Sequence, residues 1–305
     1  YAYSGNSNYL QQLQESEADP DKYLRTFGVS IGYGKRLSWP DDYFSFYGEL
    51  SYQMYMMKDW PYMILTDGMS HNLALNLQIS RSSIDNPIYT RRGSQFTLGL
   101  KITPPYSLIK GTTDAQYAQM TNSEKYNLLE YHKWRFSGKV FTPLSADSKL
   151  VLMARAEFGY LGHYNKNAKS PFESFYMGGD GMSSYSSYST EYVAMRGYQS
   201  GSLTPYDPAT GRNMGYVYNK FTMELRYPIA LEQNATIWAL AFVEAGNCFS
   251  DIRDYNPFNL KRSAGVGVRI FLPMFGLLGI DWGWGFDEIN GSKQYGGSQF
   301  HFVLG

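Results

Sequence analysis

One arginine and two glutamates are placed in the sequence so that they could form a charged cluster inside a protein. The arginine belongs to the segment Met195–Tyr198, in which a glycine permits a tight turn. One glutamate lies on the next predicted strand and the other on the strand after it. A guanidinium and carboxylates form charge-assisted hydrogen bonds, which are stronger than neutral ones. We interpret five residues as a lock that fixes the loop to the wall of strands: Arg196, Gly197, Tyr198, Glu224 and Glu244. The alternative is an ordinary surface loop rich in Ser, Tyr and Gly.

No other group of residues indicates catalysis. The four histidines (71, 132, 163 and 301) lack metal-type spacing, so each is predicted to lie at a rim or in an interior. Residues 178–181 resemble a phosphate-binding loop only superficially, because no strand-to-helix context follows and no Gly-Lys-Ser/Thr sequence is present. A Ser/His pair of the kind a lipase needs is not found. We therefore predict a protein that is not an enzyme, with no catalytic residue, no cofactor and no metal.

The elements that would position the cluster are β-strands. In residues 220–227 charged or hydroxylic side chains alternate with large apolar ones, so Lys220, Glu224 and Arg226 share one face of a strand. The same period of two recurs along almost the whole chain, and helical periodicity is nearly absent. We predict about eleven strands, near residues 25–35, 43–56, 71–81, 94–104, 131–142, 149–162, 215–227, 235–247, 262–272, 276–286 and 298–305.

Loop lengths and composition decide between a soluble sheet and a membrane barrel with a wet lumen. Short connections are predicted near residues 36–42, 143–147, 228–234 and 272–275, and long ones near 4–23, 58–70, 107–130, 163–215, 249–261 and 287–297. Short turns on one rim and long loops on the other are typical of outer-membrane barrels. The aromatic fraction of 17% suits aromatic girdles at two membrane interfaces. We predict an all-β fold, a transmembrane antiparallel β-barrel of the bacterial outer membrane, with the long loops extracellular.

Other features limit the organisation of the chain. The net charge of zero gives no nucleic-acid footprint, no apolar run reaches the roughly 18 residues of a transmembrane helix, and the single Cys248 is interpreted as inert packing. Single-chain barrels have an even number of strands. Because Tyr1–Tyr3 resembles the end of another strand, we expect the first strands to be missing. Residues 1–305 are predicted to be one partial barrel domain, with 163–214 as a long extracellular loop that folds into the lumen.

The chain resembles the barrel domains of the BamA-type outer-membrane assembly proteins. Met195–Tyr198 is similar to the Val-Arg-Gly-Phe/Tyr signature of their sixth extracellular loop, and Glu224 and Glu244 match the family's acidic partners. Further resemblances are an upstream Phe-Tyr-x-Gly-Gly motif (Phe175, Tyr176, Gly178, Gly179), a periplasmic turn (Asp85, Pro87, Gly93) and the terminal β-signal (Gln299, Phe300, His301, Phe302, Val303, Leu304, Gly305). By comparison with the family's sixteen-stranded barrel, about eleven or twelve strands are covered here, without the periplasmic POTRA repeats.

The resemblance implies the central subunit of the outer-membrane β-barrel assembly machinery. Such a protein folds and inserts client outer-membrane proteins without ATP, through a lateral gate between its first and last strands, and residues 299–305 would form the last-strand side of that gate. Implied partners are nascent outer-membrane proteins, accessory lipoproteins and other subunits, membrane lipids and lipopolysaccharide, and no nucleic acid. The alternatives are a two-partner-secretion or autotransporter-type translocation barrel, or a general porin.

Three glycines on one predicted strand, Gly279, Gly283 and Gly285, leave little side-chain volume on its inward face. They could reflect flexibility near the gate or room for the loop to enter, and we prefer the second interpretation.

Overall fold

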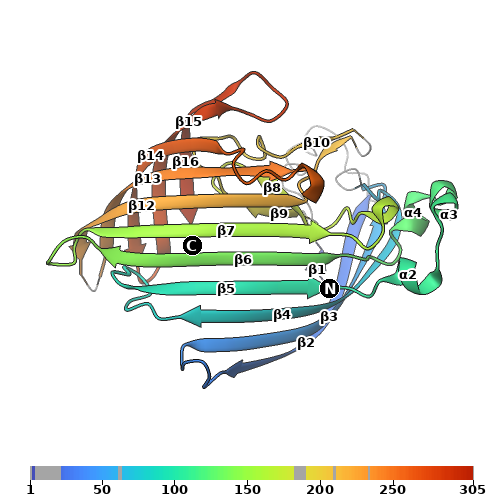
Figure 1. Cartoon of the computed structure of the whole chain (residues 1–305), viewed down its shortest axis with the longest axis horizontal. Helices are drawn as coiled ribbons and strands as arrows, with labels where there is room; N and C mark the ends of the chain where they lie inside the picture. Colours follow the sequence, from blue (N-terminus) through green and yellow to red (C-terminus); the bar gives the residue numbers. More distant parts are fainter. Residues whose placement is uncertain are drawn as a thin grey trace.

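The computed structural model describes residues 2–3, 22–60, 64–181, 190–208, 211–232 and 234–304. Its main element is a sheet of twelve strands in which every neighbouring pair runs antiparallel (Figure 1). In spatial order the strands are β1 (Ala2–Tyr3), β2 (Tyr23–Arg36), β3 (Phe44–Lys58), β4 (Gly68–Ser82), β5 (Gly93–Ile102), β6 (His132–Pro143), β7 (Val151–Gly162), β12 (Val217–Leu231), β13 (Thr236–Phe249), β14 (Lys261–Leu272), β15 (Gly276–Glu288) and β16 (Tyr295–Leu304).

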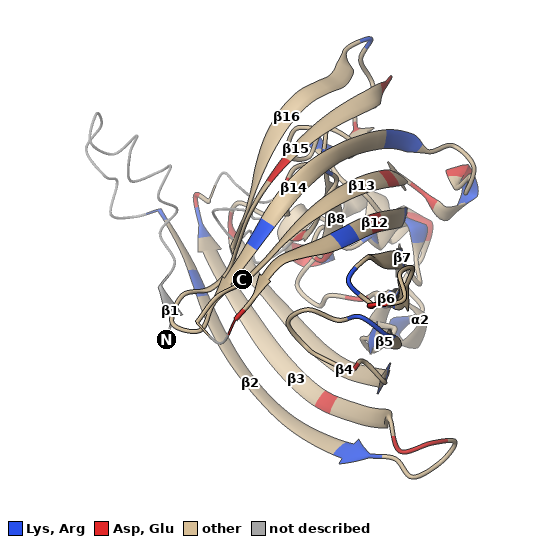
Figure 2. Ribbon diagram, turned by 90° about the vertical axis from the view of Figure 1, so that its left-hand side faces the viewer, with Lys and Arg blue, Asp and Glu red and all other residues tan. Residues whose placement is uncertain are grey.

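The sheet is strongly curved, and Figure 2 shows it bending from β2 at the bottom to β16 at the top around a concave side. All eleven predicted strands are present. Ala2 and Tyr3 pair with Thr26 and Arg25 of β2, as expected for the end of a further strand. No helix among the described residues is long and apolar enough to cross a membrane.

Strand β12 shows how the alternating pattern produces two different faces. Phe221 and Met223 are 45% and 48% exposed on the convex side, whereas Lys220 and Glu224 are 1% and 5% exposed on the concave side. Arg226 lies on the same concave face and contacts Glu224. The predicted inward orientation of the three charged residues is therefore confirmed.

Strand β13 departs from the alternation because its inward face is largely apolar. Trp238, Leu240 and Phe242 are buried on the concave side, followed by the carboxylate of Glu244, which is 2% exposed. Val243 faces outward and is half exposed. Two residues of connections pack over this inward row, Arg196 over Phe242 and Tyr89 against Trp238.

Two predicted connections differ from the structure. The turn expected at residues 228–234 begins later, because β12 continues to Leu231 and accommodates Pro228 at a break in register before Ala230. Proline has no N–H to donate, so a bulge is a position where a strand tolerates it. The expected loop at 107–130 contains three short helices, α2 (Tyr106–Lys110), α3 (Asp114–Gln119) and α4 (Asn122–Lys125).

The concave side is filled by the long connection between β7 and β12. It contains the 3-10 helix η1 (Lys166–Ala168) and the short strands β8 (Ser174–Met177), β9 (Thr190–Val193), β10 (Tyr206–Asp207) and β11 (Arg212–Asn213). A second 3-10 helix, η2 (Ile252–Asp254), follows β13. Apolar residues of the long connection, among them Phe172, Phe175 and Met195, are buried in one cluster with Tyr55 and Tyr131 near the sheet.

Candidate functional site

The two sequence motifs of the long loop lie side by side and form one small structure. Strands β8 and β9 pair in parallel, with Met177 opposite Val193. Beyond this pair, the Met195 N–H donates to the Gly179 carbonyl at 2.9 Å, and the Gly179 N–H donates to the Tyr198 carbonyl at 3.0 Å. Phe175 and Tyr176 lie on β8, and the Phe-Tyr-x-Gly-Gly motif therefore supports the tip that carries Arg196.

Glycine is needed at the turns of this structure. Gly178, Gly179 and Gly197 have φ angles of +130°, +76° and +85°, which L-amino acids with a side chain rarely adopt. A Cβ at Gly178 would also collide with the carbonyl oxygen of Gln199. The glycines thus permit the sharp reversals that aim Arg196 at the sheet.

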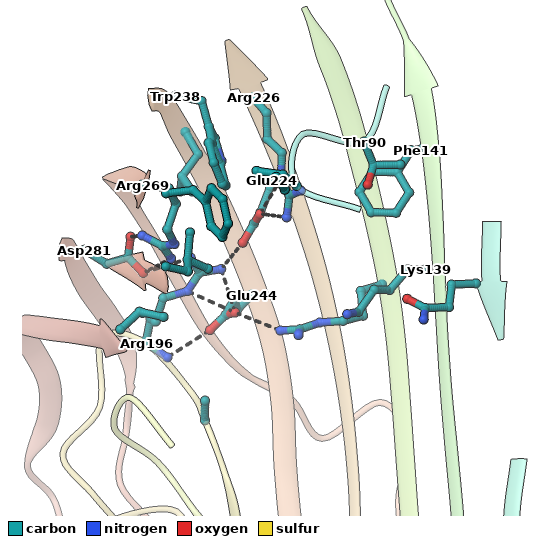
Figure 3. A pocket seen from close by; sticks show the side chains of 18 of the residues that line it. Thr90, Lys139, Phe141, Arg196, Glu224, Arg226, Trp238, Glu244, Arg269 and Asp281 are labelled. Atoms are coloured by element: carbon teal, nitrogen blue, oxygen red, sulfur yellow. Dashed lines mark hydrogen bonds and ion pairs between the residues drawn. The ribbon is translucent and has the colours of Figure 1, made fainter. Parts of the chain in front are cut away.

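The structure brings Arg196 together with both glutamates named from the sequence (Figure 3). Its Nη2 donates to Glu224 Oε1 and Glu244 Oε1 at 2.8 Å each, and its backbone N–H donates to Glu244 Oε2 at 2.9 Å. Arg196 and Glu244 are 6% and 2% exposed. Charge-assisted bonds in such a buried place are strong, and their loss leaves unpaired charges, so this contact holds the loop to the wall.

Two further partners of Arg196 were not predicted from the sequence. Nη1 donates to Asp281 Oδ2 at 3.2 Å, and the guanidinium carbon lies 3.6 Å from the centre of the Phe242 ring. Asp281 alternates with the apolar residues Ile280 and Trp282 on β15, so the alternation alone could have placed it inside. The sequence gives no such indication for Phe242, because apolar residues are expected on the outward face and the alternation alone does not show that this phenylalanine faces inward.

Each acid of the cluster also has a second cation. Arg226 pairs with Glu224 at 2.7 Å, Lys220 with Glu244 at 3.1 Å, and Arg269 with Asp281 at 2.6 Å. Lys220 additionally donates to the Ala194 carbonyl in the loop at 2.7 Å. We call the seven residues the lumen cluster: Arg196, Lys220, Glu224, Arg226, Glu244, Arg269 and Asp281.

The glycines of β15 make room for the loop tip. A Cβ on Gly283 would lie 2.8 Å from the Gly197 nitrogen, and a Cβ on Gly197 would lie 2.8 Å from the Gly285 nitrogen. The Gly197 N–H donates to His301 Nε2 on β16 at 2.8 Å. The backbone of the tip therefore packs directly on β15 and β16, which supports entry of the loop as the reason for Gly283 and Gly285. Gly279 instead faces the Arg269 guanidinium.

Tyr198 fixes the other side of the tip. Its side chain is fully buried, and its hydroxyl donates to the Arg262 carbonyl at 2.8 Å and accepts from the Asp287 N–H at 3.3 Å. Burial raises the pKa of Tyr198 to about 12, so the hydroxyl keeps its proton for this bond. The loop tip is thus held by side-chain and backbone contacts from β12 to β16.

A second ionic cluster holds the loop to the opposite part of the sheet. Lys133 of β6 is 3% exposed and contacts Glu173 at 3.0 Å and Glu191 at 2.8 Å. Lys101 of β5 also pairs with Glu173, and Arg135 pairs with Glu191. Glu173 precedes β8 and Glu191 lies on β9, so this outer cluster anchors the base of the structure whose tip carries Arg196.

The predicted turn after β4 folds inward beneath the lumen cluster. The Asp85 carboxylate accepts from the Arg91 and Arg92 N–H groups at 3.0 and 3.2 Å. Gly93 has a φ of +110°, and a Cβ there would collide with the backbone of Ser83. Pro87 lines an internal cavity. Tyr89 is buried against Trp238, with ring centres 5.7 Å apart.

The last predicted strand is β16, which pairs with β15 from Tyr295 opposite Glu288 to Leu304 opposite Leu278. Phe300, Phe302 and Leu304 face outward, and His301 is 4% exposed on the concave side. Gln299 donates to the Gly296 carbonyl at 3.1 Å, and Val303 lines the internal cavity. Gly305, the final residue of the predicted gate strand, lies outside the described residues.

The family model of the Omp85 superfamily domain matches residues 2–305. Among solved structures, "The crystal structure of BamA from Haemophilus ducreyi lacking POTRA domains 1-3" is similar at 16% sequence identity and a TM-score of 0.64. That match covers 92% of this chain and 54% of the other, so the chain spans about half the length of that relative. The similarity shows the fold alone, and it confirms the predicted fold class.

A second solved structure, "LpxR from Salmonella typhimurium", has 10% identity and a TM-score of 0.30, with 97% of this chain and 92% of that chain covered. A TM-score this low supports no argument about fold or activity. No curated protein sequence matches the chain.

Proposed function

The chain belongs to the Omp85 superfamily, and we propose that it forms the membrane barrel of a protein that inserts or translocates other proteins at the bacterial outer membrane. The outward rows of apolar side chains, such as Phe221, Met223 and Leu225 on β12, suit contact with lipid and lipopolysaccharide. The polar and charged inward rows suit a lumen. The long connections would then lie on the extracellular side.

Within this class we infer the central subunit of a β-barrel assembly machinery. A nascent barrel has unpaired backbone groups, and each costs several kcal/mol in hydrocarbon. A strand at an opening sheet edge can satisfy these groups by β-augmentation. In this proposal β16 forms one side of a lateral gate, a client strand pairs with it, and no ATP is needed. Nascent outer-membrane proteins, accessory lipoproteins and other subunits are the partners.

The observation that carries the proposal is the fixed position of the loop tip. Arg196 and Gly197 occupy the concave side and contact β15 and β16, including the strand that the gate would use. A loop anchored in this way obstructs the lumen, which opposes the steady conductance of a general porin. The contact between Gly197 and His301 also holds the inward face of β16 to the loop, independently of any strand that pairs with β16.

Depletion of the full-length protein in its native bacterium tests the proposal. An assembly factor predicts that many unrelated outer-membrane proteins are lost together, whereas a two-partner-secretion or autotransporter-type barrel predicts the loss of one cargo. A photo-crosslinking amino acid that replaces Gln299 on β16 should capture client C-terminal strands. The same amino acid in place of Asn76 on β4 is the control. Depletion that leaves the outer-membrane protein profile unchanged would refute the assembly role.

A further inference from the structure

A cavity of about 520 Å³ lies between the lumen cluster and the inward turn after β4. Its volume is in the range of small-molecule sites, roughly 300–1,000 Å³. Figure 3 shows Lys139 and Phe141 on one side and Trp238 and Arg269 on the other. Ile84 and Pro87 of the turn also line it. The cavity thus has a well-defined wall of strands and a floor.

Two cations face each other directly across neighbouring strands in this cavity. Lys139 on β6 is the register partner of Arg155 on β7, and Gln95 on β5 is the partner of Lys139 on its other side. Like charges directly opposite each other destabilise a sheet. No carboxylate of the described residues lies within ion-pair distance of Lys139, while Arg155 is 3.2 Å from Glu157 and 4.0 Å from Glu244. The pair is therefore incompletely neutralised.

The charges of the residues that line the cavity also add up to an excess of positive charge. Six cationic side chains line the cavity, against four carboxylates, and Glu157 supplies one more negative charge to Arg155. Glu224, Glu244 and Asp281 are each paired with at least two cations of the lumen cluster. One positive charge is left over, and by position it is that of Lys139.

Hydrogen-bond donors are also in excess. Trp238 Nε1 is buried and lacks an acceptor among the described residues, and Arg155 Nε lies 3.2 Å from Glu157 Oε2 without the geometry of a hydrogen bond. Both side chains line the cavity. No buried side-chain acceptor of the lining lacks a donor within the same part of the chain. A buried donor without a partner costs free energy. The space between these groups therefore favours a ligand that offers acceptor oxygens and negative charge.

Much of the remaining lining is apolar. Trp238, Leu240, Phe271 and Leu277 come from β13, β14 and β15, and Phe141 lies two residues from Lys139 on β6. We propose that the cavity is a binding site for an amphipathic anion, that is, a carboxylate or phosphate attached to an apolar chain or ring. The acid group binds at Lys139 and Arg155, and the apolar group packs against Trp238 and Phe271. This site goes beyond the proposed assembly function and does not depend on it.

The test uses the full-length protein in lipid nanodiscs with 4-(trifluoromethyl)benzoate as the probe, and its binding is followed by fluorine NMR relative to empty nanodiscs. The uncharged match is 4-(trifluoromethyl)benzamide. We expect the benzoate to bind at least about tenfold more tightly than the amide, the effect of one charge-assisted hydrogen bond. Lys139→Gln should weaken benzoate binding by a similar factor. Lys149→Gln removes the same charge from an exposed turn and should leave binding unchanged.

Competition identifies the source of the ligand. Decanoate displacing the probe more effectively than unlabelled benzoate would assign the site to a lipid-derived acid, and the reverse order would assign it to a soluble aromatic acid. The proposal is overturned if the amide binds as well as the benzoate, if Lys139→Gln binds like the wild type, or if inorganic phosphate displaces the probe as effectively as benzoate. Lys139→Arg keeps the charge and should retain binding, which separates lost charge from altered folding.

Discussion

The charges of the lumen cluster predict how much three substitutions in it destabilise the protein, and Arg196→Ala is not the most damaging of them. Four cations surround three acids. Arg196→Ala leaves each acid with at least one cation, because Arg226, Lys220 and Arg269 remain and Arg155 also lies 4.0 Å from Glu244. Breaking a buried ion pair costs about 3–5 kcal/mol when an uncompensated charge is left behind. Since the remaining charges balance, we expect the cost of Arg196→Ala to lie near the low end, about 3 kcal/mol.

Glu244→Gln should be more damaging than removal of the arginine. The Glu244 carboxylate accepts from the backbone N–H, Nε and Nη2 of Arg196 and from the Thr222 hydroxyl, and it also pairs with Lys220. The variant leaves four cations around two acids, so we expect about 5 kcal/mol. Glu224→Gln leaves the same excess of cations, but Glu224 contacts only Arg196 and Arg226, so this variant should cost less than Glu244→Gln.

Urea unfolding of the three variants in lipid vesicles measures these free energies, and proteolysis of residues 163–214 reports whether the loop tip has left the lumen. Arg262→Ala is the matched control, because this arginine pairs with Asp287 while 66% of its side chain is exposed. It should change stability little, as surface ion pairs do. Two results would refute this role of the cluster: Arg196→Ala unfolding like the wild type with its loop still protected, or Glu224→Gln costing more than Glu244→Gln.

Three further outcomes are expected. Gly283→Val should expel the loop tip and make it protease-sensitive, while Gly99→Val, whose Cβ position is open, should not; equal protection would contradict the packing of the tip. Burial alone would raise the pKa of Glu173, but the charges of Lys133 and Lys101 outweigh this effect and lower the pKa from 4.5 to about 2. The outer cluster should therefore stabilise the loop fully above about pH 4.5 and lose this effect as the pH falls toward 2. Proteolysis at graded pH measures this against a Lys133→Met variant, in which only Lys101 still lowers the pKa of Glu173 and the dependence should be weaker. Tyr89→Ala should cost about 3–5 kcal/mol in urea unfolding through lost packing on Trp238, and a cost below about 1 kcal/mol would show that the turn does not close the cavity.

The sequence predicted most of the sheet because side-chain alternation is a local property of each strand. It also predicted the contact partners Arg196, Glu224 and Glu244. The helices at residues 106–125 were missed, although Thr113 with Gln116 and Thr121 with Glu124 form capping boxes that are visible in the sequence. Those helices are too short for a helical period to emerge.

The outer cluster could not have been predicted in the same way. Glu173 and Glu191 belong to a loop whose path depends on tertiary packing. The partners of Glu173, Lys101 and Lys133, lie on strands 72 and 40 residues away in the sequence. Nothing local distinguishes these four residues from solvated surface charges. Only the fold of the loop, with β8 beside β9, brings the two acids to one lysine.

The apolar inward face of β13 links the loop, the turn and the cavity. An inward apolar row is unfavourable beside water, so each member needs a cover. Arg196 covers Phe242 at 3.6 Å, and Tyr89 covers Trp238 at 5.7 Å. Leu240 lies between them and lines the cavity. The weak alternation of β13 therefore has a physical cause: this strand packs against the loop tip at one end and the turn at the other. The stretch between them lines the cavity in which the apolar ligand group would pack against Trp238 and Phe271.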